Sequence, residues 1–88
     1  MPDSVELALT LHNLASVQAA AGKPDEADAL YRREIALREK IQGEDNPSLA
    51  LALESYAAFL QQTGKDSQAA EVQTRAGNIR AKLEKAGE

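Results

Sequence analysis

The sequence matches itself when it is shifted by 42 residues. The identical pairs run along most of that unit: Leu7-Ala8-Leu9 falls on Leu49-Ala50-Leu51, Gly22-Lys23 on Gly64-Lys65, Arg38 on Arg80, and Lys40 on Lys82. An internal period of this length is typical of a protein built from stacked supersecondary units. Any fold of this chain must therefore contain the same structural unit twice.

Each unit is predicted to contain two helices joined by a short turn. Gly22 and Gly64 are expected to end the first helix of each unit, because glycine readily takes the left-handed conformation that closes a helix. Pro24 is expected at the start of a second helix, where its missing N–H costs nothing. Asn46-Pro47 is the clearest start signal, since a capping side chain is followed by proline in the first turn.

The remaining boundaries carry weaker signals. Asp3 and Glu6 have the spacing of a capping box at the start of the first helix. Asp66 or Ser67 is expected to cap the fourth helix, and Gly43 is expected to end the second.

The composition supports helices throughout. Hydrophobic residues make up 43% of the chain but aromatic residues only 3%, so alanine and leucine supply most of the apolar volume. This mixture suits close helix packing and is poor for a β-sandwich. Short turns make neighbouring helices antiparallel. We therefore predict an all-α fold of four helices, with two tandem antiparallel helix–turn–helix repeats at about 3–43 and 46–86 in a single domain, 1–88.

Several classes of protein are disfavoured by simple counts. The chain has no cysteine, which excludes disulfides, thiolate metal sites and cysteine nucleophiles. The net charge of −4 and the pI near 5.0 disfavour binding to nucleic acid or to an anionic membrane. No apolar run approaches the roughly 20 residues that span a bilayer. The N-terminus shows no basic segment followed by an apolar one, so we expect a cytoplasmic protein.

The turn and helix residues together resemble a tetratricopeptide repeat. The similar segments are Leu11-His12-Asn13-Leu14-Ala15, Gly22-Lys23, Glu26-Ala27 and Leu30-Tyr31-Arg32-Arg33. The period, together with Leu37-Arg38-Glu39-Lys40 and Gly43-Glu44-Asp45-Asn46-Pro47, resembles the longer variety found in kinesin light chains and in many bacterial multi-repeat proteins. The resemblance covers nearly the whole chain. It implies a fragment of a right-handed α-solenoid that binds a protein or peptide on its concave surface, with no cofactor and no enzymatic activity.

Four positions depart from the family pattern. Gln18 stands where tyrosine is usual, Glu34 where a small residue is usual, and Gln73 where an aromatic residue is usual. Gly77 weakens the last helix by about 1 kcal/mol relative to alanine. The polar second unit is typical of a terminal repeat. Because two repeats are fewer than the roughly three that usually bury a continuous core, we expect a fragment of a longer array or self-association through an open face.

The first and third helices are predicted to carry the binding residues. At 100° per residue, the core side of the first helix holds Leu7, Leu11, Leu14 and Gln18, and Leu9 lies opposite. Leu51 has the same place on the third helix. An apolar centre with polar surroundings suits an extended or helical peptide. The predicted groove consists of Leu9, His12, Asn13, Ser16, Ala20, Leu51, Glu54, Ala58 and Gln62. The alternative is that Leu9 and Leu51 only pack between adjacent helices.

The polar residues suggest no chemistry beyond binding. His12 has no second histidine and no cysteine at helical spacing, so we predict neither a metal site nor a catalytic residue. Some relatives bind C-terminal carboxylates with a lysine and asparagine clamp, but here Glu54 would repel such a ligand. Glu34 and Arg38 lie four residues apart in the favourable order, and we expect a structural ion pair.

Two functions fit these residues. The first is a protein–protein interaction scaffold that holds a peptide segment across the first and third helices. The second is a structural self-assembly element, in which open repeat faces pair to form a homodimer. The acidic charge favours neither nucleic acid nor membrane as a partner.

Overall fold

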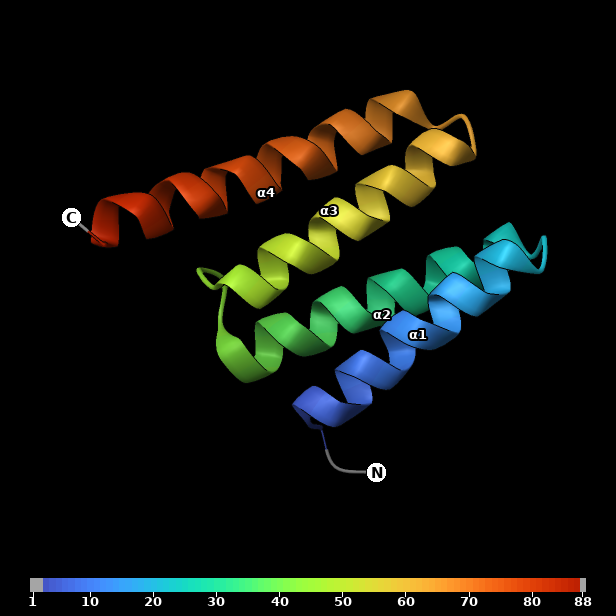
Figure 1. Cartoon of the computed structure of the whole chain (residues 1–88), viewed down its shortest axis with the longest axis horizontal. Helices are drawn as coiled ribbons and strands as arrows, with labels where there is room; N and C mark the ends of the chain where they lie inside the picture. The colour runs from blue at the N-terminus through green and yellow to red at the C-terminus, as the bar shows by residue number, and fades with distance from the viewer. Residues whose placement is uncertain (1–2, 88) are drawn as a thin grey trace.

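The computed structural model describes residues 3–87, and over that range it contains only helices and turns. In chain order, α1 spans Val5–Ala20, α2 Pro24–Gln42, α3 Pro47–Gln62 and α4 Asp66–Ala86 (Figure 1). The predicted all-α fold of two tandem helical hairpins is confirmed by these boundaries. Within the described range, none of the helices has the length and apolar character needed to cross a membrane.

α1 and α3 begin at equivalent capping residues. The Ser4 side chain accepts a hydrogen bond from the backbone N–H of Leu7 at 3.0 Å, and Asn46 accepts one from Leu49 at 2.8 Å. Such a side chain satisfies a backbone donor that has no partner in the first helical turn. The predicted helix starts at Asn46 and at Pro24 are therefore confirmed.

The predicted capping box of α1 is wrong, because the capping residue is Ser4 and not Asp3. The Asp3 carboxylate instead forms an ion pair with Lys40 of α2. The hydrogen bond from Lys40, together with its charge, lowers the pKa of Asp3 below the ordinary value of 3.8. A charged partner on the next helix has thus replaced the local backbone contact that the sequence pattern indicated.

The predicted cap of α4 is also wrong. Lys65 occupies the capping position, and neither Asp66 nor Ser67 makes a capping hydrogen bond. Lys65 has φ −96° and ψ 61°, which differs from the extended backbone that aims a capping side chain at the first turn.

The two hairpin turns close in the same way. Gly22 and Gly64 have φ of 77° and 79°, in the left-handed region where a side chain would be strained. The following N–H groups reach back into the helix, with Lys23 donating to the Gln18 carbonyl at 2.9 Å and Lys65 to Leu60 at 2.8 Å. This pattern satisfies carbonyls that the helix end leaves open. The glycine-based ends of both first helices are confirmed.

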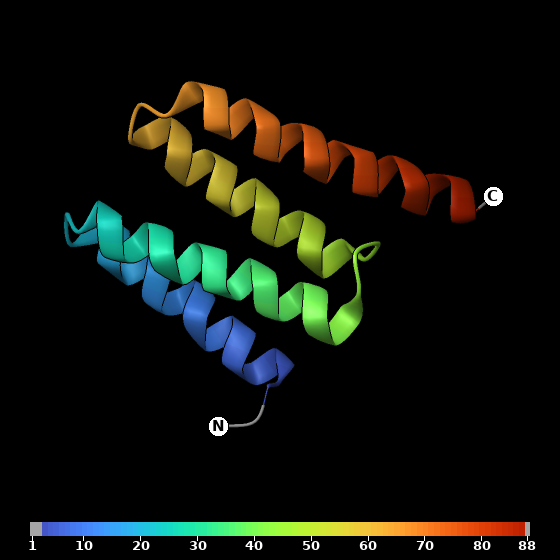
Figure 2. The same cartoon turned by 180° about the vertical axis from the view of Figure 1, so that it is seen from behind.

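The four helices pack in the order of the sequence. α1 packs against α2, α2 against α3, and α3 against α4. Figures 1 and 2 show the resulting row from both sides, with α1 at one end and α4 at the other. The molecule measures 43 × 34 × 14 Å along its principal axes. Both end helices therefore have one side that no other helix of the described chain covers.

The larger core cluster includes residues of all four helices and an aromatic group at the junction between the two hairpins. Tyr31 of α2 meets Tyr56 and Phe59 of α3, with ring centroids 5.8 and 5.2 Å apart. These are all the aromatic residues of the chain, and each is buried. Burial of one such ring contributes roughly 1.5–3 kcal/mol. The three aromatic side chains thus join α2 to α3, and the same core cluster continues into α1 and α4.

The predicted core side of α1 is correct at Leu11 and wrong at Leu14. The buried residues of α1 are Ala8, Leu11 and Ala15, whereas Leu14 is 44% exposed. Alanine lets a neighbouring helix approach closely, so α2 packs over the two alanines. Leu14 consequently lies on a neighbouring side of α1.

Candidate functional site

A groove runs between α1 and α3, with α2 below it. It consists of two adjoining pockets of about 280 and 410 Å³ that share His12 and Ser55. Leu9 of α1 and Leu51 of α3 both line the smaller pocket, and both remain more than half exposed. We call these two pockets together the α1–α3 groove. It offers a continuous surface with an apolar part at one end.

Most of the predicted binding residues line the α1–α3 groove. Those that do are Leu9, His12, Ser16, Ala20, Leu51, Ala58 and Gln62. Asn13 and Glu54 line neither pocket. In the row of four helices, α1 and α3 each have one edge toward the α1 end of the row and one toward the α4 end. Asn13 lies on the edge of α1 that faces away from the other helices, at the position equivalent to Ser55. Glu54 lies on the edge of α3 that faces α4.

Glu54 is held by the fourth helix. Two nitrogens of Arg80, Nε and Nη2, each donate a hydrogen bond of 2.7 Å to the Glu54 carboxylate. These hydrogen bonds lower the pKa of Glu54 below its ordinary value of 4.5. The carboxylate is thus engaged on the α4 side. The expected repulsion of an anionic ligand by Glu54 does not apply inside the groove.

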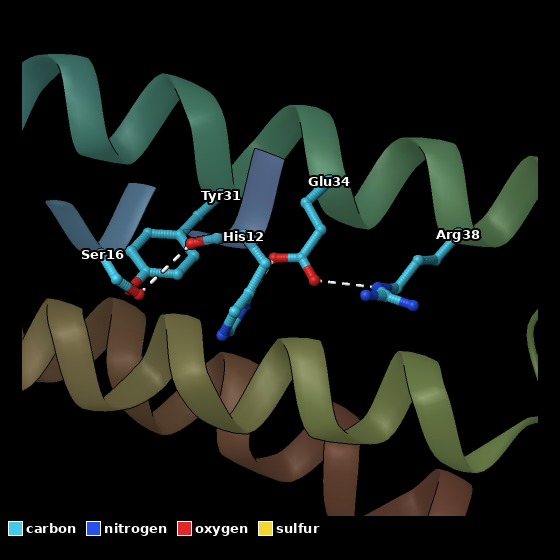
Figure 3. Close-up of polar contacts among 5 residues, drawn as sticks. All are labelled: His12, Ser16, Tyr31, Glu34 and Arg38. Carbon is cyan, nitrogen blue, oxygen red and sulfur yellow. Dashed lines mark hydrogen bonds and ion pairs between the residues drawn. The ribbon is translucent and has the colours of Figure 1, made fainter. Parts of the chain in front are cut away.

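Three groove residues that the sequence analysis did not include come from α2. Tyr31, Glu34 and Arg38 point from α2 into the space next to α3, where they meet His12 and Ser16 of α1 (Figure 3). Helical spacing of the first helices could not find them, because they belong to the floor and not to the walls. The signal for two of them was present, since the predicted Glu34–Arg38 pair is confirmed by an Nε–Oε2 distance of 2.8 Å.

Glu34 is the central charge of the groove floor. Its side chain is only 1% exposed, and it contacts His12 Nδ1 at 3.1 Å through one oxygen and Arg38 Nε at 2.8 Å through the other. Because a carboxylate only accepts hydrogen bonds, the imidazole Nδ1 carries the proton in this contact. A buried charge needs such partners to offset its lost hydration. Glu34 therefore orients both basic side chains.

Arg38 keeps hydrogen-bonding capacity toward the groove. Its two terminal nitrogens make no hydrogen bond within residues 3–87, although Nε is engaged by Glu34. No fully buried side-chain nitrogen of the described residues lacks a partner, so these nitrogens reach the surface. Arg38 lines the same pocket as Leu9 and Leu51. The pocket thus combines two apolar side chains with free N–H donors.

The polar side chains of the groove contact one another across α1 and α2. No group of three or more histidine, cysteine or acidic side chains within residues 3–87 could hold a metal ion. The Ser16 and Tyr31 hydroxyls lie 3.5 Å apart, and His12 contacts Tyr31 edge-on with ring centroids 6.1 Å apart. These contacts fix the positions of side chains, and they bring no base to a nucleophile.

A larger pocket of about 460 Å³ lies between α2 and α4 over α3. An ion pair of 3.0 Å between Glu39 of α2 and Arg75 of α4 joins two of its lining residues. Arg32, which also lines it, already bonds Tyr56 and Asp28. The large apolar residues that line this pocket are buried or half-buried, whereas Leu9 and Leu51 are more than half exposed. We therefore regard the α1–α3 groove as the better candidate site.

The family model for the tetratricopeptide repeat matches residues 6–82. The chain belongs to the tetratricopeptide-repeat family. The match includes most of all four helices, so both hairpins are tetratricopeptide repeats. Comparison with curated proteins gives no match. Tetratricopeptide repeats generally mediate protein–protein interactions and are typically not enzymes.

Proposed function

We propose that this chain is an interaction scaffold whose α1–α3 groove binds a peptide segment or helix of a partner protein. The observation that carries the proposal is the pair Leu9 and Leu51, exposed on neighbouring first helices and lining one pocket. Covering a leucine side chain fully contributes roughly 1.5–3 kcal/mol. Two leucines in one pocket therefore favour a partner with an apolar side chain at that point.

The polar groups of the groove complement the partner's backbone. The terminal nitrogens of Arg38 supply N–H donors next to Leu9 and Leu51, and the hydroxyl groups of Ser48 and Ser55 lie in the same pocket. A segment in the groove presents carbonyl oxygens that these groups can bond. Because the groove residues stand on helices, little conformational entropy is lost when a partner binds.

We also infer that the chain is of the 42-residue variety that resembles kinesin light chains. Gly22 and Gly64 stand one period apart and have nearly the same positive φ. Ser4 and Asn46 also stand one period apart, and both cap a first helix. The residues that begin and end the two first helices thus repeat at the 42-residue period.

The proposal is tested by selecting binders from a displayed library of short random peptides. Peptides selected on the unmodified chain are then titrated against a variant carrying Leu9→Glu and Leu51→Glu. We expect affinity to fall at least about tenfold, because a charged carboxylate is costly to cover with apolar groups. A matched control, Leu14→Glu with Val17→Glu, places the same charges on α1 outside the groove and is expected to bind normally.

Circular dichroism is used to check that both variants keep the helical content of the unmodified chain. Retained affinity for the Leu9 and Leu51 variant, or an equal loss for the control, would show that the groove is not the binding surface.

A further inference from the structure

Two polar side chains of the α1–α3 groove keep hydrogen-bonding atoms that nothing within residues 3–87 satisfies. The Nε2 atom of His12 makes no hydrogen bond there, although Nδ1 contacts Glu34 at 3.1 Å. The terminal nitrogens of Arg38 are likewise unbonded, because only its Nε contacts Glu34. No fully buried side-chain nitrogen in the described range lacks a partner, so all of these atoms reach the surface. They are therefore available to a ligand.

Glu34 holds His12 and Arg38 next to each other. Each is bonded to a different oxygen of one carboxylate, which lies between them (Figure 3). Both line the same pocket of about 280 Å³ as Leu9 and Leu51. The Glu34 side chain is 1% exposed and that of Arg38 11%. A buried anchor thus positions both basic side chains before any ligand binds, which lowers the entropy that binding costs.

The unbonded atoms of the two side chains are of opposite hydrogen-bonding character. The guanidinium of Arg38 only donates. Since Glu34 accepts from His12 Nδ1, the neutral imidazole carries its proton there and its Nε2 accepts. Arg38 balances the charge of Glu34 at 2.8 Å, and no other acidic or basic side chain besides the imidazole lines either pocket. A ligand group that fits must therefore both accept and donate, and it needs no charge.

The second hairpin uses the equivalent positions differently. One period after His12 and Arg38 stand Glu54 and Arg80. Arg80 donates from both Nε and Nη2 to the Glu54 carboxylate, each at 2.7 Å. In the second hairpin this donor and this acceptor thus satisfy each other. In the first hairpin Glu34 holds both side chains, and their remaining donor and acceptor atoms are left for a ligand.

We propose that this pocket recognises the side-chain amide of an asparagine or glutamine in the partner peptide. The inference rests on the proposed function of the α1–α3 groove and names what that groove selects. The amide carbonyl accepts from Arg38, and the amide nitrogen donates to His12 Nε2. Leu9 and Leu51, in the same pocket, cover a large apolar residue beside the amide.

Other side chains fit the same atoms less well. A carboxylate accepts from Arg38 but sets a lone pair against the lone pair of His12 Nε2. An apolar side chain covers both polar groups and leaves them without partners, which costs more than the hydrogen bonds themselves contribute. A partner's backbone carbonyl satisfies Arg38 alone. The side-chain amide supplies an acceptor and a donor from one planar group.

The test starts from a displayed library of random peptides selected on the unmodified chain. Peptides whose binding is weakened by Leu9→Glu with Leu51→Glu are kept as groove binders. We expect these peptides to share an asparagine or glutamine beside a large apolar residue. Each is then synthesised with the matching acid, and separately with leucine, in place of the amide. Affinity is expected to fall at least about tenfold in both cases, because a hydrogen bond is lost or opposed.

His12→Phe removes the acceptor and keeps an aromatic ring beside Tyr31. The preference for the amide over the acid is expected to shrink at least about tenfold, because no lone pair then opposes a carboxylate. Glu34 keeps its bond to Arg38 in this variant, and circular dichroism checks its helicity. Asn13→Phe, at the next position of α1 and outside both pockets, is the control that should keep the preference. The peptide substitutions leave the chain unchanged, so they test the proposal even if His12→Phe loses helicity.

Groove binders that share no asparagine or glutamine would overturn the inference and leave the proposed function intact. A preference for the acid over the amide would do the same, since the pocket would then be an anion site. An unchanged preference in folded His12→Phe would show that His12 does not recognise the amide. If no selected peptide is weakened by Leu9→Glu with Leu51→Glu, both the groove assignment and this inference are overturned.

Discussion

The hydroxyl of Tyr56 in α3 donates a hydrogen bond of 2.7 Å to the carboxylate of Asp28 in α2. Arg32 donates to the same hydroxyl at 3.0 Å and pairs with Asp28 at 2.9 Å. This triad joins the two hairpins through polar groups next to the aromatic cluster. Burial, and then the bond to Asp28, raise the pKa of Tyr56 above its ordinary value of 10.0.

Tyr56→Phe is expected to lower the free energy of unfolding by about 1 kcal/mol, the typical net contribution of one hydrogen bond. The ring stays in the core, and Asp28 and Arg32 still pair with each other. Urea unfolding followed by circular dichroism measures the change. A fall in the free energy of unfolding as large as that expected for removing the whole ring would contradict a contribution from the hydroxyl alone.

The same residue predicts a dependence of stability on alkaline pH. Since the pKa of Tyr56 is raised in the folded state, its contribution is fully present below pH 10.0 and is lost as pH rises through the folded pKa. Urea midpoints measured on both sides of pH 10.0 are expected to fall less steeply in Tyr56→Phe than in the unmodified chain. Parallel pH profiles for the two proteins would contradict this origin of the alkaline loss.

Equivalent residues of the two hairpins are expected to differ strongly in their contribution to stability. Phe59→Ala removes a buried ring at the junction and should cost about 3–5 kcal/mol. Val17→Ala, one period earlier, changes an exposed side chain and should alter stability by less than about 0.5 kcal/mol. Thermal unfolding of both variants gives the comparison. Similar losses would mean that the Val17 side chain is covered in solution.

Two glycines are expected to respond in opposite directions to alanine. Gly77 lies inside α4 with open space around it, so Gly77→Ala should stabilise the chain by about 0.5–1 kcal/mol. Gly64 has φ 79°, so Gly64→Ala should destabilise it by roughly 1–2 kcal/mol. Chemical denaturation distinguishes the signs. A destabilising Gly77→Ala would indicate a contact on α4 that this structure does not show.

Removing Glu34 is expected to cost about 3 kcal/mol, because it leaves the largely buried Arg38 guanidinium without its partner. The double variant Glu34→Ala with Arg38→Leu should recover a substantial part of that loss. Equilibrium unfolding of the single and double variants forms the necessary cycle. If the two substitutions simply add, the pair is not an energetic unit.

Local signals in the sequence predicted the helix ends better than they predicted the helix faces. Gly22 and Asn46 act through their own backbone and side chain, so their roles were readable from neighbouring residues. Leu14 was assigned to the core because it lies at helical spacing from Leu7 and Leu11 and has a large apolar side chain. In the structure Ala8 and Ala15 are fully buried and Leu14 is exposed, because the side of α1 that is covered depends on how the two helices pack together.

The groove was predictable in its walls and not in its floor. Leu9 and Leu51 recur at one period, which is a property of the sequence alone. Arg38 reaches the groove because of how α2 is rotated under α1 and α3, and no periodicity specifies that rotation. Asn13 and Glu54 were included because the spacing of residues on one helix does not show which neighbouring helix lies on which side of it. Packing order decides which edge of a first helix faces the groove.

The placement of every aromatic side chain at the junction gives the molecule a built-in optical reporter. The chain has no tryptophan, and its two tyrosines both lie between the hairpins. Near-ultraviolet dichroism therefore records chiefly the α2–α3 contact, together with the α1 side chains that touch Tyr31, whereas far-ultraviolet dichroism records all four helices. A state in which the hairpins swing apart while remaining helical would lose the first signal and keep the second. The two spectra can thus separate the joining of the repeats from the folding of each repeat without any added label.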